Sequence, residues 1–257
     1  MYLDKILAKH REVSLADKRD LGELIARSKS SPPPRGFTSR LRQESKASLA
    51  VVAEIKRRSP SRGELKKDLD PVEISKKYEQ GGASCISVLT DHEFFGGSID
   101  DLKLARAKVD LPVLRKDFTV SMHDICDARL MGADCVLLIA AALTKVELDE
   151  FFRFATDLGI DALIEVHDEN ELASAVEVGA QLIGVNQRDL KTFEVDHQRA
   201  VRMAAMMPPN VVRVAESGVK TQDEARGLRD AGYDAILVGE SLVTSADIAK
   251  SVRDLRV

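Results

Sequence analysis

Short apolar runs alternate with segments of helical period along most of this chain. After residue 48, runs such as LAVVAEIK (49–56) and CVLLIA (135–140) are each followed by a segment whose apolar positions recur every three or four residues. Such alternation is typical of βαβ units, because parallel strands buried on both faces read as apolar runs. The predicted strands are residues 49–56, 84–90, 112–116, 135–140, 162–166, 182–186, 211–216 and 235–239.

A weak internal repeat marks the joints between the predicted helices and strands. The segments GGASCISVL, MGADCVLLI, VGAQLIGVN and AGYDAILVG begin at Gly81, Met131, Val178 and Ala231, and each places a glycine between a helix and a strand. Glycine is common just after a helix because it adopts the left-handed backbone at little cost. Eight strand–helix pairs predict an α/β fold of the (β/α)8 TIM barrel type, with an open doubly wound sheet as the alternative. Open doubly wound sheets often bind nucleotides, but the first strand here is not followed by GxGxxG and the sequence has no Walker motif. This absence weakens the open-sheet alternative.

The first 47 residues differ in pattern from the rest. Residues 1–20 are amphipathic and lack the apolar core of a signal peptide, so we expect a folded helix there. Three consecutive prolines in SSPPPRGF (30–37) exclude helix at that point. A length of 257 residues suits one barrel, which takes about 250. We therefore expect a single domain over residues 1–257, with a helical extension at 1–47 and the barrel at 48–257.

Composition narrows the classes of partner. Acidic and basic residues are interspersed and the net charge is −4, which disfavours nucleic acid, although a few lysines can still focus a field on a small anion. The apolar runs are too short to cross a membrane. Three cysteines without metal-ligand spacing indicate buried thiols in a cytoplasmic protein. The histidines considered as metal ligands show no metal-like grouping; these are His92, His123, His167 and His197. We expect no metal, no nucleic acid, no membrane and no obligate protein partner.

Charged residues interrupt the predicted strands near their carboxyl ends. Glu54 and Lys56 lie two apart on the first strand and so share a face, while Lys116, Glu165 and Glu216 end the third, fifth and seventh strands. Alternate strands of this barrel share a layer of side chains, so four of these residues should converge, with Lys56 just above. The alternative is a buried salt-bridge network that only closes the barrel, but burying ions costs several kcal/mol each unless the pairing is very good. Polar residues at these strand ends are typical of catalysis in this fold.

Glycines follow the last two strands. The seventh strand runs into Ser217 and Gly218, and the eighth runs into Gly239 and Glu240. The loops after strands 7 and 8 form the usual phosphate site of this fold, because glycine permits close approach and a helix amino terminus supplies N–H donors. This pattern predicts a small phosphorylated substrate. Phe94 and Phe95, in the loop before Gly96 and Gly97, are candidates to cover such a ligand, and the alternative is that these aromatic side chains only pack within the loop.

These residues lie within longer stretches that resemble the indole-3-glycerol phosphate synthase family of tryptophan biosynthesis. AEIKRRSPSRG (53–63) resembles the first-strand signature of that family. The other matching stretches, in the same order and spacing, are SVLTDHEFFGGS (87–98), LRKDF (114–118), LIEVHDENEL (163–172), IGVNQRDL (183–190), AESGV (215–219) and VGESLV (238–243). The resemblance covers essentially the whole chain.

The resemblance implies a ring closure without a cofactor or metal. The substrate would be 1-(2-carboxyphenylamino)-1-deoxyribulose 5-phosphate, which loses carbon dioxide and water to give indole-3-glycerol phosphate. Lys116 resembles the general acid that protonates the carbonyl oxygen, Glu165 the general base of the dehydration, and Lys56 the second lysine, which holds anionic groups and is a candidate for the later acid. The remaining positions implied are Glu54, Asn186, Glu216 and Ser217 in the active site, and Ser59, Phe95, Phe118, Arg188, Gly218, Gly239 and Glu240 in substrate binding.

Two expectations about individual side chains follow. Some family members carry a small residue where Glu240 stands, so the Glu240 side chain should point away from the phosphate. Desolvation and neighbouring cations should lower the pKa of Lys116, whereas the nearby glutamates oppose that shift.

Three other functions remain open from the sequence. Phosphoribosylanthranilate isomerase chemistry needs one acid and one base, so the paired lysines would be surplus. A Schiff-base aldolase would use Lys116 as nucleophile. A barrel that only senses a phosphorylated metabolite would have no need of both acid and base.

Overall fold

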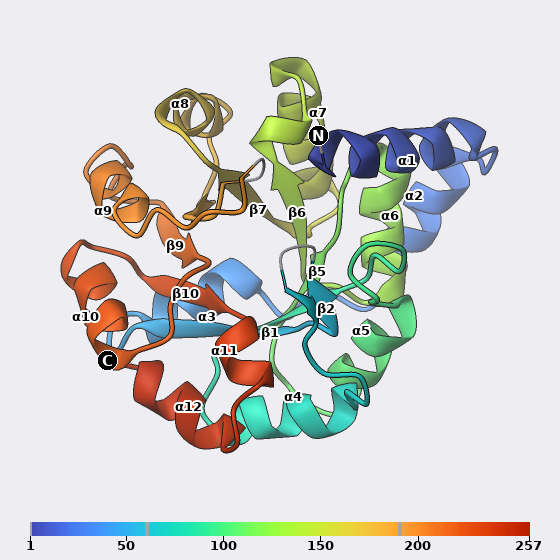
Figure 1. Cartoon of the computed structure of the whole chain (residues 1–257). Coiled ribbons are helices and arrows are strands. Elements are labelled where there is room, and N and C mark those ends of the chain that lie inside the picture. Colours follow the sequence, from blue (N-terminus) through green and yellow to red (C-terminus); the bar gives the residue numbers. More distant parts are fainter. Residues whose placement is uncertain (1, 60–61, 190–191) are drawn as a thin grey trace.

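Eight parallel strands form a closed ring at the centre of the molecule (Figure 1). The computed structural model describes residues 2–59, 62–189 and 192–257. The ring is closed because β1 pairs with β4 on one side and β10 on the other, which confirms the (β/α)8 barrel over the open sheet. The strands are β1 (Ala50–Ile55), β4 (Cys85–Leu89), β5 (Val113–Lys116), β6 (Cys135–Ile139), β7 (Asp161–Val166), β8 (Leu182–Asn186), β9 (Val212–Glu216) and β10 (Ala235–Val238).

Helices surround the ring and connect successive strands (Figure 1). Several begin at polar caps; Thr144 and Thr221, for example, each form a reciprocal capping box with the glutamate three residues later. The helices of the barrel are α4 (Pro71–Gln80), α5 (Ile99–Arg106), α6 (Met122–Met131), α7 (Lys145–Asp157), α8 (Glu169–Glu177), α9 (Arg199–Ala204), α10 (Gln222–Asp230), the short α11 (Glu240–Val243), α12 (Ile248–Leu255) and the 3-10 turn η1 (Ala140–Ala142).

The barrel interior is apolar at its amino-terminal end and polar at the other. Phe37 and Leu41 of α3 (Phe37–Glu44) are fully buried against the first residues of the strands, including Ala50 and Ala235. A second apolar core lies between the strands and the outer helices. Because α3 closes the amino-terminal end, the charged residues at the carboxyl ends line the open mouth.

The amino-terminal extension holds more helices than the single one expected. Four residues separate α1 (Tyr2–Ala16) from α2 (Leu21–Lys29), and the side chain of Asp20 caps α2 by accepting from Glu23 N. α2 packs on α6, so tertiary contacts decide this break as well as local sequence. The prolines within residues 30–37 are non-helical, as predicted. A short hairpin of β2 (Arg58–Ser59) and β3 (Gly63–Glu64) in the loop after β1 was not anticipated.

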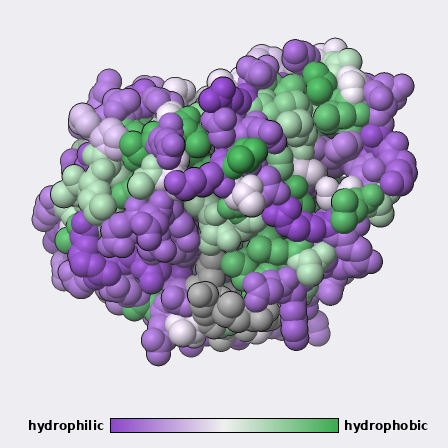
Figure 2. Space-filling model, turned by 90° about the horizontal axis from the view of Figure 1, so that it is seen from above, coloured by the Kyte–Doolittle hydropathy of each residue, from purple (hydrophilic) through white to green (hydrophobic). Residues whose placement is uncertain are grey.

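Hydrophilic residues cover most of the face seen in Figure 2, and hydrophobic ones lie between them in small groups. Every helix in the described ranges is too short or too polar to span a bilayer.

Candidate active site

A cavity of about 280 Å³ opens at the carboxyl ends of the barrel strands. Its lining comes from strands far apart in the sequence and from the loops that follow them. The structure brings every sequence-predicted site residue to this cavity: Glu54, Lys56, Ser59, Phe95, Lys116, Phe118, Glu165, Asn186, Arg188, Glu216, Ser217, Gly218, Gly239 and Glu240.

Hydrogen bonds and ion pairs join side chains of β5, β7, β8 and β9 in an array at the cavity. Lys116 Nζ on β5 lies 2.7 Å from Glu165 Oε2 on β7 and 3.7 Å from Glu216 Oε2 on β9. Asn186 Nδ2 donates to Glu165 Oε1 at 3.1 Å, and the Ser217 hydroxyl donates to Asn186 Oδ1 at 2.8 Å. Three of the four residues expected to share a layer, Lys116, Glu165 and Glu216, therefore meet directly from the alternate strands β5, β7 and β9.

The second lysine has its own carboxylate. Lys56 Nζ lies 2.6 Å from Glu54 Oε1, and the hydroxyl of buried Ser87 donates to Glu54 Oε2 at 3.4 Å. Both lysines line the cavity, so two ammonium groups with separate partners face the same space.

The pKa of Lys116 differs in direction from the sequence expectation. Burial lowers the pKa of Lys116, but the carboxylates of Glu165, Glu216 and Glu54 outweigh it and raise that pKa above its ordinary value. The expected lowering is wrong because the nearest charged groups are carboxylates rather than cations.

The two neighbouring glutamates differ in protonation. Burial opposes ionisation of Glu165, yet Lys116 and His167 hold its pKa well below the usual range. Burial and the charge of Glu165 raise the pKa of Glu216 to about 8. These shifts favour a charged Lys116 and an ionised Glu165, and they favour the protonated form of Glu216.

Backbone geometry shapes the rim after β9 and β10. Ser217 and Gly218 both have positive φ, 68° and 83°, and the Gln187 side chain donates to Ser217 O at 2.8 Å. A Cβ on Gly239 would lie 2.5 Å from Glu54 Oε1, so glycine allows the close approach of these two strands. Helix α11 begins at the next residue, and the first N–H groups of a helix have no partner within it.

The Glu240 side chain is engaged by a residue that sequence reasoning missed. Arg62, in the loop after β1, places Nε 3.1 Å from Glu240 Oε1, and both residues line the cavity. Arg62 lies within the AEIKRRSPSRG stretch, which could have marked it as a candidate site residue. Nothing in the sequence indicated that it pairs with Glu240.

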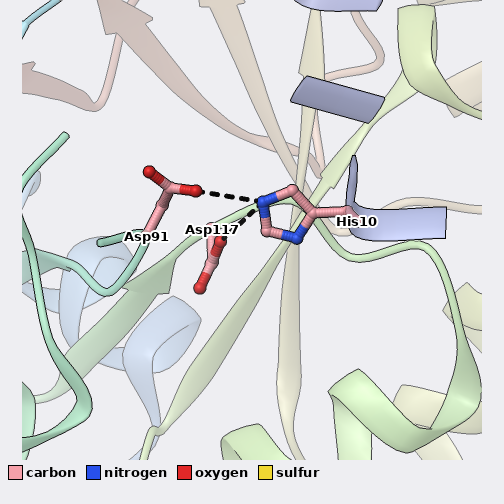
Figure 3. A group of neighbouring side chains, drawn as sticks. All are labelled: His10, Asp91 and Asp117. Carbon is pink, nitrogen blue, oxygen red and sulfur yellow. Dashed lines mark hydrogen bonds and ion pairs between the residues drawn. The ribbon is translucent and has the colours of Figure 1, made fainter. Parts of the chain in front are cut away.

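A cluster of His10, Asp91 and Asp117 ties α1 to the mouth of the barrel (Figure 3). His10 Nε2 lies 3.1 Å from Asp91 Oδ2 and 3.8 Å from Asp117 Oδ1. These are metal-ligating types, but the other oxygen of Asp91 accepts from the backbone N–H groups of Phe94 and Phe95 at 2.6 and 3.0 Å. Since Asp117 likewise accepts from Arg115 and from the backbone N–H of Phe118, the oxygens are already hydrogen-bonded and the group acts as an ion-pair cluster.

This cluster holds two aromatic side chains of the cavity wall. Phe118 stacks obliquely between His10 and Phe95, with ring centroids 5.3 and 6.2 Å away. His10 and Asp91 are 81 residues apart, so no local pattern could have paired them.

We predict that the His10 cluster stabilises the fold most at mildly acidic pH. Burial lowers the pKa of His10, but Asp91, Asp117 and Asp124 raise it overall. Because the pKa of His10 is higher in the folded state than in the unfolded state, its protonation stabilises the folded protein. This stabilisation is complete at pH values below the unfolded-state pKa of about 6.5 and is lost as pH rises through the folded-state pKa. The difference in Tm between wild type and His10→Gln, measured from pH 5.5 to 9, should shrink with rising pH. Lys9→Gln on the same helix should give a difference that does not change, and a pH-independent difference for His10→Gln would contradict the prediction.

Comparison with known proteins agrees with the family resemblance. The model of the family described as "Indole-3-glycerol phosphate synthase" matches residues 3–255. The chain is 46% identical over 251 residues to the indole-3-glycerol phosphate synthase of Chloroherpeton thalassium, covering 96% of each chain. It is 47% identical over 249 residues to that of Chlorobium luteolum, covering 96% of this chain and 95% of the relative. Among solved structures, thiamine phosphate pyrophosphorylase from Pyrococcus furiosus matches 83% of this chain and 95% of its own, with a TM-score of 0.61 and 19% identity, which shows the fold alone.

Proposed function

This chain belongs to the indole-3-glycerol phosphate synthase family, and from that premise we propose which groups of its cavity carry out the ring closure. The substrate would be 1-(2-carboxyphenylamino)-1-deoxyribulose 5-phosphate and the products indole-3-glycerol phosphate, carbon dioxide and water. The observation that supports the proposal is the 2.7 Å contact of Lys116 Nζ with Glu165 Oε2 at the cavity, which would bring the proposed acid and the proposed base side by side.

Lys116 is the acid of the first step. The ring carbon that bears the carboxylate attacks the ketone carbon, and the carbonyl electrons move to oxygen, which takes the Lys116 proton. An alkoxide is a stronger base than an amine, so the raised pKa keeps the lysine charged without preventing the transfer. The bond between the ring carbon and the carboxylate then breaks and carbon dioxide leaves. The electron pair of that bond stays with the ring and restores its aromaticity.

Glu165 is the base of the second step, with Lys56 as the acid. The hydroxyl formed in the first step leaves as water with a proton from Lys56, while Glu165 removes a proton from the neighbouring carbon of the new ring. Lys116 and Lys56 each donate one proton, and Glu165 takes one back. The reaction therefore consumes one proton from solvent, because the substrate carboxylate is negatively charged and carbon dioxide is neutral. Because Glu165 lies 2.7 Å from Lys116, it can return its proton to that amine.

The cavity wall supports binding of the two ends of this substrate. Phe95 and Phe118 present aromatic faces for the anthranilate ring, and ring pairs of this kind favour offset or tilted contact. Arg188 lines the same cavity, its Nη1 donates to Phe193 O at 2.9 Å, and a guanidinium suits the anthranilate carboxylate. The phosphate would bind the backbone at Ser217–Gly218 and Gly239–Glu240, with the Glu240 carboxylate held by Arg62.

We predict that inorganic phosphate competes with the substrate. If the backbone at Ser217–Gly218 and Gly239–Glu240 binds only the phosphate group of the substrate, added phosphate should raise the apparent KM and leave kcat unchanged. Initial rates with increasing phosphate should be compared with rates in chloride of the same ionic strength. An apparent KM that phosphate leaves unchanged would show that the phosphate end binds elsewhere.

The glycines of this rim are less suited to a binding test. A side chain at Gly239 would displace Glu54, and one at Gly218 would meet Val195 at 2.6 Å with a strained backbone. Substitution there should alter catalysis or stability together with binding.

The direct test is turnover. Purified protein mixed with the carboxyphenylamino deoxyribulose phosphate should produce indole fluorescence and release one carbon dioxide per indole. Binding of the compound without either product would instead favour a metabolite sensor.

A further inference from the structure

A buried histidine stands behind the proposed base. His167 directly follows β7, and its side chain is 10% exposed. Its Nε2 lies 3.3 Å from Glu165 Oε1, and its Nδ1 lies 3.1 Å from Glu171 Oε2 on α8. Among the described residues, His167 is not one of those that line the cavity, so it contacts Glu165 without facing the substrate space.

We propose that His167 is a positioning residue, a cation clamped by Glu171 that keeps Glu165 ionised and its carboxylate oriented throughout the reaction. The inference rests on the proposed role of Glu165 as base and adds a group that neither the sequence nor the proposed mechanism assigns.

Hydrogen bonds to Glu171 fix which ring nitrogen faces Glu165. Glu171 Oε2 accepts from the backbone N–H of His167 at 2.7 Å and lies 3.1 Å from Nδ1, so Nδ1 carries a proton. A neutral ring would then present the lone pair of Nε2 to a carboxylate oxygen 3.3 Å away, which is repulsive. A protonated ring replaces that repulsion by an ion pair on each side.

The electrostatics of the site agree with this protonation. Burial lowers the pKa of His167, but Glu165 and Glu171 raise it to about 9. Glu165 itself faces Lys116 from β5, Asn186 from β8 and Glu216 from β9. Of these neighbours Lys116 is the cation, so His167 supplies the second positive charge.

The second charge matters because Lys116 gives up its proton in the first step. At that point Glu165 loses its nearest cation while its carboxylate remains buried. Without His167, Glu165 would more readily take up a proton before the dehydration, and its capacity as a base would be lost. With His167 charged, the carboxylate stays ionised for the step in which it acts.

The test compares pH profiles of kcat for wild type, His167→Gln and Glu171→Gln. His167→Gln removes the cation but keeps a polar side chain, so the acid limb of kcat should move to higher pH by about one unit while KM changes less than about twofold. Glu171→Gln should move the limb in the same direction by less, since it weakens the clamp without removing the ring. The matched control is His123→Gln on α6, whose ring contacts Arg19 O on the outside of the barrel, and its profile should match wild type.

A second readout does not depend on activity. Nitrogen NMR of the five histidines, with His167 assigned by its loss in His167→Gln, should show a protonated ring at pH 7.5. A neutral His167 at that pH, or an acid limb that does not move in His167→Gln, would overturn the inference. A lowered Tm with an unmoved limb would mean that His167 only supports the start of α8. Failure of the proposed function would look different, because wild type would then form no indole.

Discussion

Lys116→Ala should lower kcat by about 10²-fold or more, the usual contribution of a positioned acid. The ammonium group lies within 4 Å of two carboxylates and lines the cavity. In the proposed mechanism it protonates the oxygen that becomes negative during ring closure. Truncation removes both the proton and the stabilising charge. It also leaves Glu165 and Glu216 without their shared cation, so the variant should be tested for folding by its Tm before kcat is compared.

Lys116→Arg separates the proton from the charge. Arginine keeps a positive charge beside Glu165, but a guanidinium with a pKa above about 12 is a poor proton donor near neutrality. We therefore expect Lys116→Arg to recover little of the lost kcat. Activity close to wild type in this variant would show that only the charge is needed.

Borohydride distinguishes the acid from a Schiff-base lysine. An acid donates its proton and never bonds to carbon, whereas an imine-forming lysine becomes attached to the substrate carbonyl and can be trapped by reduction. Intact-mass and peptide analysis after borohydride treatment during turnover should show no added mass on Lys116. A trapped adduct would contradict the acid assignment and support an aldolase-type reaction.

Glu165→Gln should also lower kcat by about 10²-fold or more while KM changes little. The amide keeps the shape of the side chain and can still accept from Asn186, but it cannot take a proton. Product formation under saturating substrate gives kcat, and binding of substrate to the inactive variant gives a separate measure of affinity. A kcat near the wild-type value would exclude Glu165 as the base.

The control for this variant is a glutamate outside the cavity. Glu177 on α8 is 74% exposed and lies 3.8 Å from exposed Lys145, and Glu177→Gln removes the same charge without touching the array. Its kcat should equal wild type. If Glu177→Gln lost as much activity as Glu165→Gln, the effect would come from net charge rather than from a base.

The sequence by itself determined the barrel and the positions of its polar residues. Eight apolar runs separated by helical segments predict parallel strands with two buried faces and favour the barrel over an open sheet, and the closed ring brings the polar residues at their carboxyl ends to one mouth. The motif around Lys56 and the glycines after the last two strands carried enough local information to place the candidate site. The family resemblance supplied the roles, which the experiments above test.

Only the tertiary structure decided the electrostatics and the contacts between distant segments. The pKa of Lys116 is raised rather than lowered because β7 and β9 bring Glu165 and Glu216 beside it, 49 and 100 residues further along the chain. The pairs of His10 with Asp91 and of Arg62 with Glu240 likewise join segments that share no local pattern. The physical reason is that strand and helix periodicity is a property of neighbouring residues. The free energy of a buried charge, in contrast, depends on whichever charges and dipoles lie within a few ångströms, whatever their separation in sequence.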